Sequence, residues 1–148
     1  MNTLSIKKMS PWATVPTRST AGSAGYDLYA CLPDKTPIII PARGRVTIPT
    51  GIAIGIADSR TAAFIFGRSG LGTKHGIVPA NAVGVVDSDY RGEILVSLAN
   101  HSDVDFVVNH GDRVAQMVLM PVYTPLLCLC DDLDETSRGT AGFGSTGQ

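Results

Sequence analysis

The chain has 148 residues, a length that suits one domain with a sizeable core. Its net charge of -1 argues against binding duplex nucleic acid, which needs clustered Lys and Arg, and its apolar stretches are too short to cross a membrane. Only 17% of the residues are charged, which suggests that part of the surface is covered by other copies of the chain.

Short apolar runs recur along the chain between turns rich in glycine and proline. They predict strands over residues 38–40, 45–49, 51–56, 62–66, 83–86, 93–99, 105–108, 113–120 and 126–129. Many runs are apolar at every position, which indicates strands covered on both faces. The one helix candidate, residues 69–75, is short and contains glycine. The pattern predicts an all-β fold, a jelly-roll-like β-sandwich or barrel with one short helix.

The character of the sequence changes at Asp131. An acidic patch begins there, and the glycine-rich run RGTAGFGSTGQ follows it to the end of the chain. This run has one aromatic residue, Phe143, and little else that a core could bury. We therefore expect a single domain over residues 1–148 with a flexible C-terminal tail, residues 131–148, that a bound ligand orders.

The three cysteines show no spacing to histidine that is typical of a zinc site. Cys128 and Cys130 form a C-x-C pair in a strand-like run, and we expect free, buried thiols in a reducing compartment. The N-terminal residues lack the apolar core of a signal peptide. This favours a cytoplasmic location, or a nuclear or virion location if the protein is eukaryotic or viral.

Four glycine-rich turns each carry a polar or charged residue: AGYD, GRSGLG, VVDSDYRG and RGTAGFGSTG. Glycine lets the backbone approach a ligand closely, and free backbone N–H groups can hold phosphate oxygens. Arg68 and Arg138 add positive charge for the same purpose. Any one turn alone reads more simply as a solvated β-turn, but the four together indicate a polyphosphate site.

Read in chain order, five segments resemble the motifs of the homotrimeric dUTP diphosphatases, the dUTPases. The segments are residues 24–28 (AGYDL), 67–76 (GRSGLGTKHG), 84–92 (GVVDSDYRG), 111–116 (GDRVAQ) and 138–147 (RGTAGFGSTG). One departure is Gly67, where the family usually has proline. The resemblance implies a β-rich jelly roll and a homotrimer with active sites shared between subunits. It also implies hydrolysis of dUTP to dUMP and pyrophosphate, which limits uracil in DNA and supplies dUMP for thymidylate synthesis.

The same resemblance gives roles to residues near the reacting atoms. Asp87 would be the catalytic carboxylate that activates a water for attack on the α-phosphorus. Tyr90 would press its ring on the deoxyribose and leave no room for a 2′-hydroxyl. Asn81 and the backbone up to Gly84 would read uracil and exclude the methyl group of thymine.

The phosphates and the outer face of the base are assigned in the same way. The implied contacts come from Arg68, Ser69, Gly70, Gln116, Arg138, Phe143, Gly144, Ser145 and Thr146. Phe143 would stack on uracil, and the tail would close over the site as a lid. Mg²⁺ is the implied cofactor, held mainly by the triphosphate and its waters, with Asp27 acting on it through water.

Two other functions stay open. A dCTP deaminase-like or bifunctional relative would share the fold, and a non-catalytic trimeric jelly-roll module would share the assembly. The DSDYRG turn with Asp87 favours the diphosphatase, and the presence of Tyr90 and the tail argues against the non-catalytic module.

Overall fold

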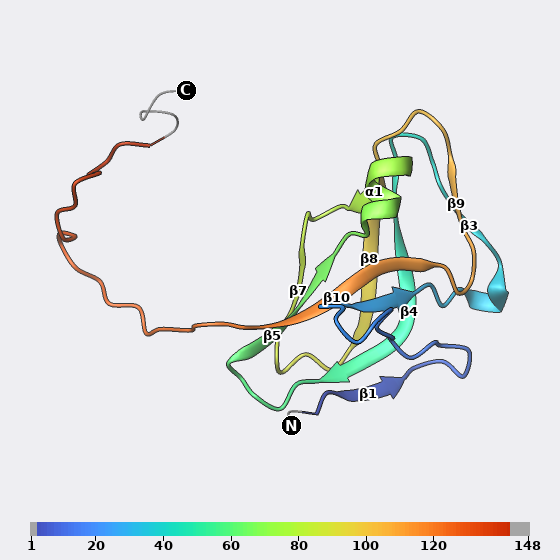
Figure 1. The fold of residues 1–148 in the computed structure, drawn as a ribbon, viewed down its shortest axis with the longest axis horizontal. Coiled ribbons are helices and arrows are strands. Elements are labelled where there is room, and N and C mark those ends of the chain that lie inside the picture. The colour runs from blue at the N-terminus through green and yellow to red at the C-terminus, as the bar shows by residue number, and fades with distance from the viewer. Residues whose placement is uncertain (1–2, 143–148) are drawn as a thin grey trace.

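The structure, a computed structural model that describes residues 3–142, consists mainly of short antiparallel strands (Figure 1). The helical segments are η1 (Pro33–Lys35) and α1 (Ser69–His75). The strands are β1 (Ser5–Lys8), β2 (Tyr26–Tyr29), β3 (Ile38–Ile40), β4 (Arg45–Gly55), β5 (Thr61–Phe66), β6 (Ile77–Pro79), β7 (Gly84–Val86), β8 (Glu93–Asn100), β9 (Phe106–Val108) and β10 (Arg113–Pro121). The prediction of an all-β fold with one short α-helix is confirmed.

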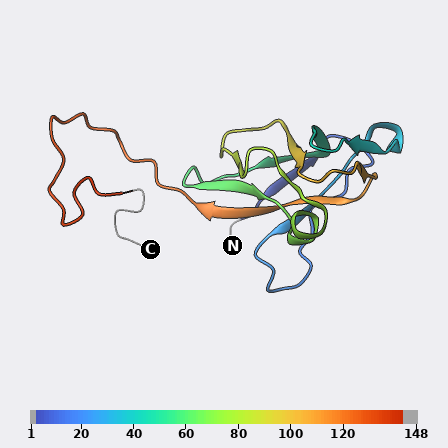
Figure 2. The ribbon, with the colours of Figure 1, turned by 90° about the horizontal axis from the view of Figure 1, so that it is seen from above.

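The strands form three antiparallel sheets, which lie in layers when seen from above (Figure 2). One sheet has the order β1-β4-β8-β6, the second has the order β2-β10-β5-β7, and the third pairs β3 with β9. Side chains from both larger sheets fill a common core, among them Ile48 and Leu98 from the first and Leu28 and Met117 from the second. Residues 50–54 of β4 are all buried, which explains why this strand reads as a continuous apolar run.

The predicted strands 45–49 and 51–56 form the single strand β4, which is irregular at Gly51. Gly51 has a left-handed φ of +66°, and the pairing of β4 with β8 shifts register between Pro49 and Ala53. A Cβ at Gly51 would lie 2.7 Å from the Cβ of Ala13 and 2.8 Å from the Sγ of Cys31. Glycine therefore meets both the backbone angle and the close packing at this point.

The prediction of a strand over residues 126–129 is wrong. After β10 the chain extends away from the body in both views (Figures 1 and 2), and residues 123–142 are exposed throughout. Cys128 and Cys130 are exposed with this segment, so the prediction of buried thiols is confirmed for Cys31 alone. A strand forms only where a neighbouring strand supplies hydrogen bonds, and none reaches this segment among residues 3–142.

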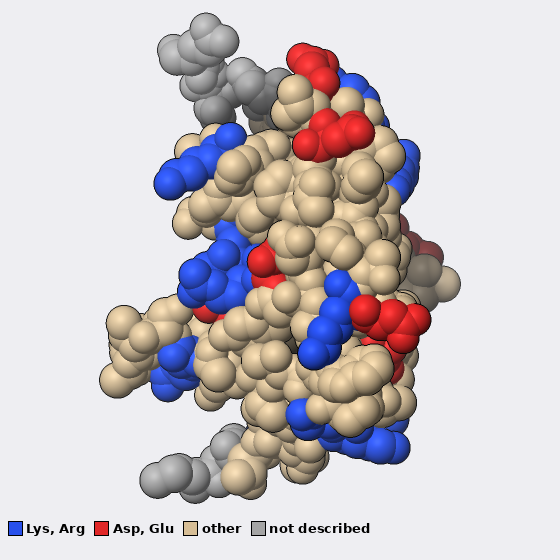
Figure 3. Space-filling model, turned by 90° about the vertical axis from the view of Figure 1, so that its right-hand side faces the viewer, with Lys and Arg blue, Asp and Glu red and all other residues tan. Residues whose placement is uncertain are grey.

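Three strands were not predicted, namely β1, β2 and β6. Each has only three or four residues, and β1 is an edge strand whose side chains are mostly exposed. Strands this short carry too few residues to show an alternating pattern. Within residues 3–142, no helix has the length and apolar character to span a bilayer. Acidic and basic side chains are interspersed over the face in Figure 3.

Candidate functional site

A cavity of about 280 Å³ opens beside β7 and β8 and collects four of the predicted site residues. Asn81 lies in the turn after β6, Gly84 begins β7, and Asp87 and Tyr90 lie in the turn that follows β7. All four line the cavity, together with β8 residues such as Glu93. The residues predicted to serve the base, the sugar and catalysis therefore share one hollow in a single chain.

Tight turns bring these residues to the cavity. Ala82 has a left-handed φ of 62°, and Val83 N donates to Asn81 O at 2.7 Å, so the backbone turns sharply before β7. A Cβ at Gly84 would lie 3.1 Å from the Cβ of Ile65 on β5, so a larger residue would push β7 away from β5. After β7, Tyr90 N donates to Asp87 O at 3.2 Å and closes the next turn.

A second group of predicted residues gathers around the buried carboxylate of Asp27. Arg68 Nε donates to Asp27 Oδ1 at 3.0 Å, and Arg113 Nη1 donates to Asp27 Oδ2 at 3.2 Å. Ser19 Oγ donates to the same Oδ2 at 3.3 Å. Asp27 is 8% exposed, so its negative charge is balanced mainly by the two guanidinium groups rather than by water.

Gln116 belongs to this second group. It pairs with Asp27 in the register of β10 and β2, and its Nε2 donates to Gly67 O at 2.9 Å, just before Arg68. The interpretation of Gln116 as a buried structural amide therefore has a contact to support it. A Cβ at Gly67 would lie 2.9 Å from Cδ of Pro79, so this position packs closely against the end of β6.

Ser69 and Gly70 begin α1, directly after Arg68. Both are exposed, and a Cβ at Gly70 would meet no heavy atom within 4 Å. The backbone of this turn is therefore open to a ligand.

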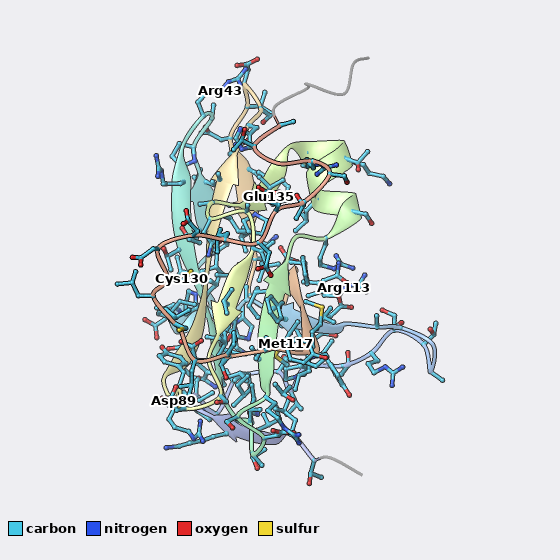
Figure 4. All side chains as sticks on the ribbon, turned by 90° about the vertical axis from the view of Figure 1, so that its left-hand side faces the viewer. Arg43, Asp89, Arg113, Met117, Cys130 and Glu135 are labelled. Carbon is cyan, nitrogen blue, oxygen red and sulfur yellow. The ribbon has the colours of Figure 1, made fainter. Side chains whose placement is uncertain are left out.

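The two groups lie apart within one chain. None of Asp27, Arg68, Ser69, Gly70 and Gln116 lines the cavity that holds Asp87. Figure 4 shows the same separation, with Asp89 from the turn after β7 and Arg113 from β10 at different edges of the body.

The predicted tail residues fall into two parts. Arg138 lies on the exposed segment that extends away from the body, while Phe143, Gly144, Ser145 and Thr146 lie outside the described residues. The predicted lid contacts of these residues stay predictions.

The fit of a metal ion was considered from the donor set. Residues 3–142 contain no group of three or more His, Cys, Asp and Glu residues that could hold one. A carboxylate has about four acceptor positions, and Arg68, Arg113 and Ser19 occupy three on Asp27. The remaining position fits a water-mediated contact but not a direct site for Mg²⁺.

Two contributors to these clusters were not predicted as site residues. Arg113 stands inside the GDRVAQ segment, but only the pairing of β10 with β2 reveals its contact with Asp27. Glu93 accepts from Tyr90 through its backbone carbonyl, an atom that every residue type carries. Neither contact has a signal in the spacing of the sequence.

Comparison with known proteins agrees with these observations. Residues 12–147 match the family model described as dUTPase. The chain is 48% identical to the deoxyuridine 5'-triphosphate nucleotidohydrolase of Desulfitobacterium hafniense, with 99% of each chain covered. It is 49% identical to the enzyme of that name from Arabidopsis thaliana, with 96% of this chain and 81% of the relative covered.

Solved structures support the fold. The dUTPase of Staphylococcus bacteriophage 80alpha, solved with dUpNHpp, superposes with a TM-score of 0.89 and 24% identity, with 100% of both chains covered. A dUTPase of phage phi11 of S. aureus, whose structure describes a structural Mg(II) ion, gives a TM-score of 0.78 over 88% of this chain and 98% of the phage chain. These likenesses confirm the predicted jelly-roll-like fold. With the family model matched over nearly the whole length, this chain belongs to the dUTPase family.

Proposed function

We propose that this chain hydrolyses dUTP to dUMP and pyrophosphate, with Asp87 as the catalytic carboxylate. The observation that carries the proposal is the cavity in which Asn81, Gly84, Asp87 and Tyr90 meet. An amide, a tight backbone turn, an aromatic ring and a carboxylate are the groups that a pyrimidine deoxynucleotide and an attacking water require.

In the proposed reaction, Asp87 accepts a proton from a water as the water oxygen bonds to the α-phosphorus. The bond between the α-phosphorus and the bridging oxygen breaks, and pyrophosphate leaves with the electron pair. Asp87 is exposed at the end of β7, which lets water reach its carboxylate. The reaction consumes one water and needs no redox partner.

Substrate selection follows from the same cavity. The amide of Asn81 can both donate to and accept from the edge of uracil, and the sharp turn up to Gly84 leaves little room for the methyl group of thymine. Tyr90 covers the sugar and excludes a 2′-hydroxyl. These roles separate dUTP from dTTP and UTP.

The phosphates would be held by a second set of groups, Arg68, Ser69, Gly70, Gln116 and Arg138 together with residues 143–146. Arginine suits this role because its guanidinium binds phosphate oxygens through two parallel hydrogen bonds. Mg²⁺ bound to the triphosphate would neutralise part of its charge, with Asp27 contacting the ion through a water.

The separation of the site residues within one chain supports a homotrimer with shared sites. Each site would combine the Asp87 cavity of one copy with the Arg68 cluster of another. The extended segment also supports assembly, because Leu126, Leu127, Leu129 and Leu133 are each at least 87% exposed. Such a run of exposed leucines is costly in water and suits burial against a second copy of the chain.

The decisive experiment measures pyrophosphate release by the purified chain from each dNTP and from UTP in the presence of Mg²⁺. Release from dUTP, with far slower release from dTTP, dCTP and UTP, is the expected result. Ammonia release from dCTP would instead indicate a deaminase-like relative. Absence of any turnover in a folded trimer would favour the non-catalytic module.

A further inference from the structure

Asp27 is held between two arginines that come from separate parts of the chain. Arg68 precedes α1, whereas Arg113 begins β10. Pairing of β10 with β2 brings Arg113 to the carboxylate, next to a register shift between Arg113 and Ala115. The sequence motifs give a phosphate role to Arg68 and none to Arg113.

The two arginines are placed differently around this carboxylate. The Arg68 side chain is 24% exposed and that of Arg113 is 47% exposed. Within the described residues, Arg68 contacts Asp27 through Nε, so both of its terminal nitrogens remain as donors. Arg113 contacts the other carboxylate oxygen, Oδ2.

The balance of charge around Asp27 depends on both cations. One arginine beside one carboxylate makes a neutral pair, whereas two arginines leave one net positive charge in the cluster. A carboxylate with a single arginine neighbour also tends to bind it through both of its terminal donors, because the two planar groups match in geometry. That arrangement would turn Arg68 toward Asp27 and away from a ligand.

We propose that Arg113 is a positioning residue for the triphosphate. By holding Oδ2 of Asp27, Arg113 balances the buried carboxylate, so Arg68 keeps both its orientation and its positive charge for phosphate oxygens. The inference rests on the proposed function, since it takes a nucleoside triphosphate as the ligand.

The test measures binding by calorimetry without Mg²⁺, so that any metal contact of Asp27 does not enter. The ligands are dUpNHpp, which carries the triphosphate, and deoxyuridine, which carries none. The variants are Arg113→Gln, Arg113→Lys, Asp27→Asn and the double variant Arg113→Gln with Asp27→Asn. The matched control is Arg43→Gln, because Arg43 pairs with a different carboxylate, Asp103, at 2.7 Å on the exposed surface.

Arg113→Gln is expected to weaken dUpNHpp binding about tenfold and to leave deoxyuridine binding unchanged. Arg113→Lys should keep most of the affinity, because it keeps the charge. Adding Asp27→Asn to Arg113→Gln should restore much of the loss, since no carboxylate then competes for Arg68. Arg43→Gln should bind both ligands like the wild type.

Equal weakening for both ligands, no rescue by lysine, or a simply additive double variant would overturn this inference and indicate a structural role. Unchanged dUpNHpp binding by Arg113→Gln, in an enzyme whose wild type hydrolyses dUTP, would overturn this inference alone. A wild-type chain that neither binds dUpNHpp nor hydrolyses dUTP would overturn the proposed function and this inference with it.

Discussion

The hydroxyl of Tyr90 donates a 3.0 Å hydrogen bond to the backbone carbonyl of Glu93, so the Tyr90 ring folds back over Gly92. A Cβ at Gly92 would lie 2.6 Å from Cζ of that ring, closer than packed carbon atoms approach. Glu93 is itself fixed, because its Oε1 accepts from Gly51 N at 2.6 Å in the irregular part of β4. The ring is therefore positioned from outside the cavity that it lines.

The first prediction concerns Gly92→Ala. The added methyl group should displace the Tyr90 ring and open space beside the sugar, so the preference for dUTP over UTP in kcat/KM should fall about tenfold. Steady-state kinetics with both substrates checks this. Gly22→Ala is the matched control, because a Cβ at Gly22 meets no heavy atom within 4 Å. An unchanged preference in Gly92→Ala would argue against sugar selection by Tyr90.

The second prediction concerns Asp87→Asn, which keeps the shape of the side chain and removes the proton acceptor. Turnover of dUTP should fall by about 10²–10⁴, with binding of dUpNHpp roughly retained. Asp89→Asn, in the same turn, is the control and should stay near the wild-type rate. If Asp87→Asn turned over dUTP at a near wild-type rate, the general base would have to be a different group.

The third prediction concerns the tail. Deleting residues 138–148 should greatly reduce turnover while leaving the melting temperature and the assembly intact, because residues 123–142 pack against nothing in the body. Pyrophosphate release, thermal melting and light scattering measure the three quantities. Full activity of the truncated chain would exclude the tail as an active-site lid.

The fourth prediction concerns the exposed leucines. Replacing Leu126, Leu127 and Leu129 with serine should weaken assembly, because each is at least 96% exposed in a single chain and gains burial only against another copy. Light scattering should give three times the 15.5 kDa chain mass for the wild type and less for the variant. A wild-type monomer with full activity would contradict the shared-site arrangement.

The fifth prediction concerns complementation between subunits. Trimers mixed from Asp87→Asn chains and tail-deleted chains should recover part of the activity, because some sites would draw both intact parts from different chains. Mixed-label mass measurement would show that exchange occurred. Absence of recovery after proven exchange would mean that the tail and Asp87 serve a site from the same chain.

Much of this molecule follows from local sequence. Continuous apolar runs predicted β4, β5, β8 and β10, because strands buried against two layers exclude polar residues. The glycine-rich turn before α1 and the turn after β7 stood out because they join chemistry-bearing residues to tight backbone. Asn81, Gly84, Asp87 and Tyr90 lie within ten residues of one another, so local turns suffice to bring them to one cavity.

Other features depended on the tertiary structure. The leucines at 126–129 have the composition of a strand, but a strand needs hydrogen-bonding neighbours, and residues 123–142 find none in the body. The contact of Arg113 with Asp27 joins positions 86 residues apart, and it arises from the register between β10 and β2. The sequence by itself determined which side chains carry the chemistry. Only the pairing of distant strands decided which of them meet, because contacts between strands depend on register and not on spacing along the chain.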